Sequence, residues 1–209
     1  MNLRLLLPFL TALPLVAAEF PDPLAAADGT VATTAQDWRE HVRPGTVQMF
    51  REHIYGKRPV AKPDDFAAKV IREDPKALDG AATLREIEIT YSGPGGKGRI
   101  RPVILTPNIS TGPAPAFLLI NFRKPDPNQP ANRGGEWPVR EIIARGYATV
   151  AFDFNDVDPD RPDGFAAGVR AIYGKQPPPA DAWGALSAWG WGASRVMDWL
   201  ETDKATDAK

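Results

Sequence analysis

The sequence of 209 residues contains no cysteine, only two histidines and only four serines. The absence of cysteine excludes a disulfide framework, a thiolate zinc site, an iron–sulfur cluster and a cysteine nucleophile. A three-histidine metal site is impossible, and any histidine base must be His41 or His53. The net charge of −1 provides no electrostatic footprint for nucleic acid, so we expect no nucleic-acid partner.

What the chain does contain is typical of a globular protein. Hydrophobic residues make up 43% and charged residues 24% of the sequence, which argues against disorder. The length suits one domain with a sizeable core. The 22 prolines are about twice the average share, which favours long ordered loops.

The N-terminus has the pattern of a targeting segment. Residues 1–18 read MNLRLLLPFLTALPLVAA, with a positive charge at Arg4, an apolar stretch and a small-residue cleavage pattern ending at Ala18. The stretch is too short for a comfortable membrane span. We therefore predict a signal peptide over 1–18, a secreted or periplasmic protein with no membrane contact after cleavage, and a flexible lead-in over 19–37.

The middle of the chain predicts a mixed sheet. Apolar Ile87, Ile89 and Tyr91 alternate with polar residues, as in a half-buried antiparallel strand. A glycine-rich turn over 92–98 follows, and then a second strand over 100–105, in which a proline favours an edge or a strand start.

Two later runs, 116–120 and 148–152, are continuous and apolar, as expected of parallel strands covered on both faces. A helix over 139–145 lies between them, with Gly146 as its C′ residue. Strand, helix and strand form a βαβ unit, so the fold class is mixed α/β.

Two further helices are predicted by apolar periodicity. One covers 46–55, and the other covers 181–201 with Asp181 as its N-cap. The glycines inside the second helix lower its helix propensity, and we expect them to allow close packing on the sheet.

No nucleophile is predicted within the chain. Ser92 and Ser110 lie in expected turns, and Ser187 and Ser194 lie inside the last helix. A nucleophile elbow needs a serine at the turn between a strand and a helix, so it cannot form inside a helix. Both histidines precede every predicted strand, although a hydrolase triad places its histidine after the nucleophile.

The aspartates between 153 and 163 do not form an EF-hand. Counted from Asp156, the glycine position holds Arg161 and the glutamate position holds Ala167. A solvated loop is the preferred interpretation, with a different kind of cation site as the alternative.

Several segments together resemble one family. They read MFREHIYGKRP at 49–59, LINF at 119–122, WP to RGYA at 137–148, and DAWGALSAWGWGASRVMDWLETD at 181–203. They are similar to the glucuronoyl esterases, carbohydrate esterase family fifteen, and to bacterial relatives labelled acetylxylan esterases. The resemblance implies an α/β-hydrolase fold, of which 38–209 would be the N-terminal portion. It also implies a secreted serine hydrolase that needs no metal or other cofactor. Its polysaccharide substrate would be the ester between glucuronic acid on xylan and lignin alcohols.

The family places its Gly-x-Ser-Arg-x-Gly-Lys elbow after a strand that follows the last helix, and its acid and histidine later still. None of these occurs before Lys209, so we expect this chain to be truncated before its nucleophile strand. We also expect it to be inactive on its own and to expose one edge of its sheet.

The candidate site residues follow from the position of the loop after 116–120. In open α/β sheets ligands bind beyond the carboxyl ends of strands, and in α/β-hydrolases this loop donates an oxyanion N–H. Asn121, Phe122 and Arg123 are therefore candidates, with a simple connecting loop as the alternative, and the sequence after Phe122 departs from the family's usual Gly-Asn-His turn.

Trp137 and Trp183 lie beside loops and are candidate sugar contacts, with core packing as the alternative. Two other functions stay open: a non-catalytic secreted module that binds polysaccharide through these two tryptophans, and a fragment of an acetylxylan-type deacetylase.

Overall fold

The computed structural model describes residues 20–128 and 137–208, which divide into two units at Gln48 and Met49. The predicted signal peptide lies outside the described residues. The first unit contains the bridge between Ala25 and Val31, α1 (Ala35–Asp37), a π-helical turn η1 (Trp38–Val42) and the start of α2 (Arg43–His53). Thr34 caps α1 through a reciprocal hydrogen bond with Asp37, so part of the predicted lead-in is helical.

The second unit begins its sheet with four antiparallel strands. These are β1 (Ala67–Ala77), β2 (Ala82–Gly93), β3 (Gly96–Ile100) and β4 (Val103–Pro107), and β2 pairs with each of the other three. The strand predicted over 100–105 is confirmed only from Val103, with Pro102 directly before its start, because the chain leaves the ladder at Arg101 and Pro102 and so separates β3 from β4. Pro102 has no N–H to donate, although its carbonyl accepts a hydrogen bond from Ile87.

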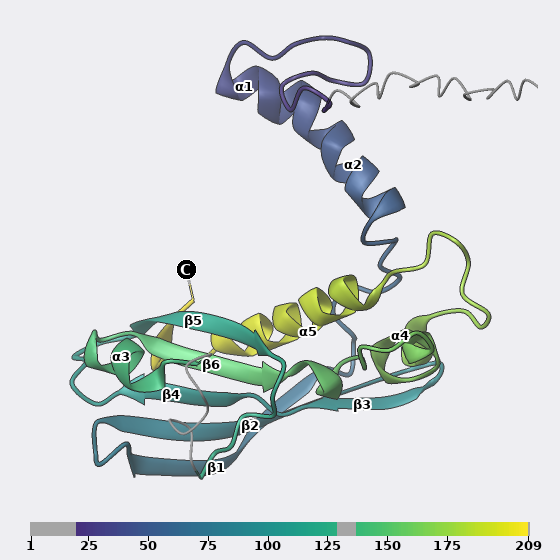
Figure 1. Ribbon diagram of the computed structural model, residues 1–209. Coiled ribbons are helices and arrows are strands. Elements are labelled where there is room, and N and C mark those ends of the chain that lie inside the picture. The colour runs from purple at the N-terminus through teal and green to yellow at the C-terminus, as the bar shows by residue number, and fades with distance from the viewer. Residues whose placement is uncertain (1–19, 129–136, 209) are drawn as a thin grey trace, which may run out of the picture. The chain divides into compact units, whose positions relative to one another are not determined.

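The predicted βαβ unit is confirmed as β5 (Ala114–Asn121), α3 (Val139–Ala144) and β6 (Ala148–Asp153), with β5 and β6 parallel. Gly146 follows α3 with a φ of 81°, as a C′ glycine does. Figure 1 shows the strands in the order β1-β2-β4-β6-β5. A short last strand, β7 (Thr206–Asp207), pairs in parallel with β5 and extends the sheet at that side. The expectation that no strand follows the last helix before Lys209 is therefore wrong.

Two apolar clusters cover opposite faces of this sheet. On one face α5 (Ala185–Leu200) packs Trp189, Trp191 and Val196 onto the buried side chains of β2, β4 and β6. On the other face α3 packs Val139 and Ile143 together with Trp137. We predicted that both faces of β5 would be covered by other elements, and this is wrong, because Phe117 is more than half exposed. Its ring packs against that of Tyr147.

The last helix starts later than predicted. Its N-cap is Gly184, not Asp181, and no side chain caps it. Asp181 instead forms an ion pair with Lys57 at 2.9 Å. Before α5 the chain forms η2 (Phe154–Asp156), η3 (Gly164–Ala166) and α4 (Gly168–Tyr173).

A buried ion pair connects the first strands to the end of the chain. Both nitrogens of the Arg85 guanidinium donate to Asp203, at 2.6 and 2.7 Å, and Thr206 at the start of β7 donates its hydroxyl to the same carboxylate. The geometry is the bidentate one that gives strong, oriented ion pairs. Among the described residues, no helix has the length and apolar character needed to cross a bilayer.

Candidate functional site

The candidate loop lies at the carboxyl edge of the parallel strands. Asn121 and Asp153 are the last residues of β5 and β6, and they are paired in register. Each side chain accepts a backbone N–H two residues later, Asn121 from Arg123 at 3.1 Å and Asp153 from Asn155 at 2.9 Å. These Asx turns bend both chains away from the sheet at the edge where α/β sheets bind ligands.

Three aromatic rings gather at this edge. The ring of Phe122 lies 4.9 Å from that of Phe154 and 5.5 Å from that of Trp189, measured between centroids. Phe154 and Trp189 are buried, whereas Phe122 is 61% exposed. We call Phe122, Phe154 and Trp189 the edge aromatic cluster; it presents one apolar ring to solvent on a rigid aromatic base.

The backbone N–H of Arg123 is already used by Asn121, so it is not available to an oxyanion in this conformation. An oxyanion hole needs donors aimed at the developing charge. The structure thus brings Asn121, Phe122 and Arg123 to the expected edge, and their oxyanion role stays a prediction.

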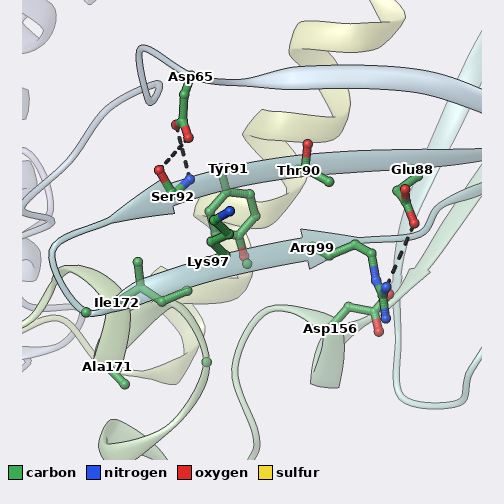
Figure 2. Close-up of a pocket in the computed structure, with 13 residues that line it drawn as sticks. Asp65, Glu88, Thr90, Tyr91, Ser92, Lys97, Arg99, Asp156, Ala171 and Ile172 are labelled. Carbon is green, nitrogen blue, oxygen red and sulfur yellow. Dashed lines mark hydrogen bonds and ion pairs between the residues drawn. The ribbon is translucent and has the colours of Figure 1, made fainter.

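A charged pocket of about 880 Å³ lies against the hairpin formed by β2 and β3 (Figure 2). Since β2 and β6 are both antiparallel to β4, this hairpin projects from the same edge of the sheet as Asn121. Glu88 pairs with Arg101 at 2.7 Å and with Arg99 at 3.9 Å. These charges are therefore paired within the pocket wall.

Asp156, the last residue of η2, also lines this pocket. Its carboxylate accepts the backbone N–H of Arg101 at 2.9 Å, and burial raises the pKa of this carboxyl above its usual range. The sequence offered no signal for this pocket, because Asp156 and the hairpin are far apart along the chain.

The two candidate sugar contacts, Trp137 and Trp183, are buried in the described structure, and their role in binding sugar stays a prediction. Trp137 is 6% exposed and donates its indole N–H to Thr149 at 2.8 Å, within the layer under α3. Trp183 is 3% exposed and packs against Trp191. The edge aromatic cluster exposes Phe122, one of the three candidates predicted from the end of the strand over 116–120.

The serines have structural partners. Ser92 donates its hydroxyl to Asp65, Ser110 to the carbonyl of Gly112, and Ser194 to the carbonyl of Gly190 one helical turn earlier. Over residues 20–128 and 137–208, no serine hydroxyl is hydrogen-bonded to a histidine, as a nucleophile and its base would be.

The aspartates after β6 also have structural roles. Asp158 is fully buried and pairs with Arg170 at 2.7 Å, and its backbone carbonyl accepts the indole N–H of Trp189. In the described part of the chain, no three histidine or acidic side chains are placed to hold a metal ion.

Comparison with known proteins identifies relatives but no matching family model. The chain is 30% identical to carbohydrate esterase MZ0003 from an unknown prokaryotic organism, over 90% of this chain and 50% of the relative. It is 25% identical to the 4-O-methyl-glucuronoyl methylesterase of Schizophyllum commune, over 90% and 40%. The structure of a glucuronoyl esterase from Solibacter usitatus matches with a TM-score of 0.80 at 30% identity, over 91% of this chain and 55% of that one.

The predicted resemblance and the α/β-hydrolase fold are confirmed by these relatives. The chain spans about half the length of the curated relatives that it matches.

Proposed function

From its relationship to the glucuronoyl esterases, carbohydrate esterase family fifteen, we propose that this chain is the N-terminal part of a secreted or periplasmic carbohydrate esterase. The proposed substrate is a glucuronoyl ester of plant cell-wall xylan, and the reaction is acyl transfer through a serine with a histidine base. The observation that carries this proposal is the match of both sequence and fold over about nine tenths of the chain.

The edge aromatic cluster supports a role in substrate contact. An ester substrate carries an apolar alcohol on one side of the scissile bond, and the exposed ring of Phe122 offers an apolar surface at the ligand-binding edge of the sheet. The Asx turn at Asn121 fixes the backbone that holds this ring.

We propose that the nucleophile, acid and base are supplied by residues outside this chain. The four serines and two histidines present offer no nucleophile–base pair in the described residues. An esterase without this pair lacks the step that splits the reaction into acylation and deacylation.

Two observations test the proposal. The coding sequence after Lys209 should continue β7 into a Gly-x-Ser-Arg elbow, and the purified 209-residue chain should not hydrolyse a benzyl ester of glucuronic acid. Hydrolysis above the buffer rate by this chain, abolished by replacing one of its own serines, would overturn the division of the catalytic residues.

The two alternatives have different outcomes. With the elbow-containing polypeptide, faster release of acetate from acetylxylan than of the alcohol from the glucuronate ester would favour the deacetylase. The non-catalytic module loses support, because Trp137 and Trp183 are both buried. Retention of the chain on xylan, lost on replacing Trp137 or Trp183 but not on replacing Phe122 by serine, would restore it.

A further inference from the structure

A second, smaller pocket lies where α5 begins. It measures about 190 Å³ and is lined by side chains from three segments, including Phe165, Arg170, Lys175, Pro178 and Trp183, with the backbone of Gly184 at the helix start. Drug-sized ligands occupy about 300–1,000 Å³, so this pocket suits a smaller molecule. We call it the α5-start pocket.

One residue that lines this pocket has a buried polar atom without a partner in the described residues. The indole N–H of Trp183 is buried without a hydrogen-bond acceptor. It lies by Gly174, which also lines the pocket: a Cβ placed on that glycine would be 3.9 Å from Nε1. The indoles of Trp137, Trp189 and Trp191, in contrast, donate at 2.7–2.8 Å. A buried donor without an acceptor is unfavourable, so a ligand that accepts a hydrogen bond from this indole would stabilise the site.

The surroundings favour an acceptor with negative charge. α5 has 16 residues and no side-chain cap, so its partial positive charge at the N-terminus is not offset by a capping side chain. The exposed Lys175 adds a positive charge to the lining, although it also acts on the neighbouring carboxylate of Asp181, whose pKa it helps to lower. The neighbouring acid, Asp181, is paired with Lys57.

Arg170 contributes less charge than its position suggests. Its guanidinium donates twice to one oxygen of Asp158, at 2.7 and 2.8 Å. The pocket thus combines an unpartnered neutral donor, a helix N-terminus and one lysine, and no unpaired carboxylate lines it in the described residues.

We propose that the α5-start pocket binds the carboxylate group of a small organic acid, with the indole N–H of Trp183 as its buried donor and Lys175 as its mobile cation. Entry requires the wall at Gly174 to open slightly, because the indole nitrogen is covered in the unliganded chain. This binding is independent of ester hydrolysis and of the edge aromatic cluster.

The test is a titration of the ¹⁵N-labelled chain with acetate and glucuronate as carboxylates and with xylose as a neutral sugar, at constant ionic strength. The indole resonance of Trp183, identified from its loss in Trp183→Phe, should move downfield and saturate with both acids. The expected Kd is on the order of 1–10 mM, given the small number of ligand atoms. Xylose should leave the resonance in place.

Variants separate this site from general attraction of anions. Backbone amides at 174–176 report binding in every variant. Trp183→Phe should weaken acetate binding at least about tenfold, Lys175→Gln should weaken it less, and Lys204→Gln, the control elsewhere on the surface, should leave it unchanged.

The proposal fails if no saturable shift occurs at Trp183, if xylose produces the same shift, or if Trp183→Phe binds acetate as the unchanged chain does. A thermal-shift titration repeats the comparison at low protein concentration: acetate should raise the Tm of the unchanged chain more than that of Trp183→Phe. Equal rises would also overturn it.

Discussion

Replacing Gly192 by alanine should destabilise the chain, although alanine is the better helix former. A Cβ at this position would lie 2.4 Å from Cγ2 of Val157 and 3.2 Å from Cγ1, whereas carbon atoms in favourable contact are about 3.5–4.0 Å apart. Val157 is fully buried and β-branched, so neither methyl group can turn away without meeting another neighbour. α5 must therefore move away from the segment that follows β6.

The magnitude follows from two opposing effects. Overpacking of a core costs typically about 1–3 kcal/mol, and the gain in helix propensity from glycine to alanine is about 1 kcal/mol. A contact of 2.4 Å belongs to the upper part of the overpacking range, about 2–3 kcal/mol, so the net loss is about 1–2 kcal/mol. For a chain of this size that loss lowers the Tm by about 2–8 °C.

Gly190 provides the matched control in the same helix. A Cβ there would be 3.6 Å from a guanidinium nitrogen of Arg58, an ordinary contact, so Gly190→Ala should raise the Tm by about 2–4 °C through propensity alone. Thermal unfolding followed by circular dichroism measures both.

The double variant with Val157→Ala should recover part of the Gly192→Ala loss, since the methyl groups in conflict are removed. A Gly192→Ala Tm equal to or above that of the unchanged chain would refute the reasoning.

Two further predictions concern charge. Asp203→Asn should lower the free energy of unfolding by about 3 kcal/mol, because it leaves the buried Arg85 without its counter-charge. The control Asp79→Asn removes an exposed ion pair with Arg140 and should cost less than about 1 kcal/mol. Equal losses for the two variants in urea unfolding would contradict this reasoning. Burial raises the pKa of Asp203, but the hydrogen bonds and charge of Arg85, together with hydrogen bonds from Thr206 and Ala205, lower it overall. The stabilisation is therefore present above pH 3.8 and is lost in stronger acid, where the difference in Tm between the variant and the unchanged chain should close. The pKa shift of Asp156 has the opposite direction, because burial raises the pKa of this carboxyl. Its ionised form therefore destabilises the fold at pH 7, so Asp156→Asn should raise the Tm there, and this gain should shrink as the pH falls towards 3.8.

The sequence predicted those elements whose local pattern agrees with their final environment. The alternation of Ile87, Ile89 and Tyr91 holds because one face of β2 is core and the other is partly open. The run at 148–152 is buried on both faces, as continuous apolar character predicts.

β1 could not be predicted, because its sequence contains almost no apolar alternation. It lies at the sheet edge, most of its side chains are exposed or half-exposed, and it contains Pro75. Its stability comes from main-chain pairing with β2, which is a property of the partner strand and not of its own residues.

The candidate site shows the same limit for single side chains. A tryptophan beside a loop has the same local sequence whether the loop turns its ring outward or inward. For Trp137 the outcome is decided by Thr149, which comes 12 residues later, on β6, and accepts the indole N–H inside the core. Trp183 is buried without such an acceptor, and Phe122 is left exposed because the Asx turn at Asn121 sends the chain off the sheet before its ring can be covered. The exposure of Phe122 is therefore determined by where β5 ends, and the unpartnered indole of Trp183 lies just before the start of α5. Both positions are ends of secondary-structure elements, where backbone and side-chain groups lack partners within the element and must find them elsewhere.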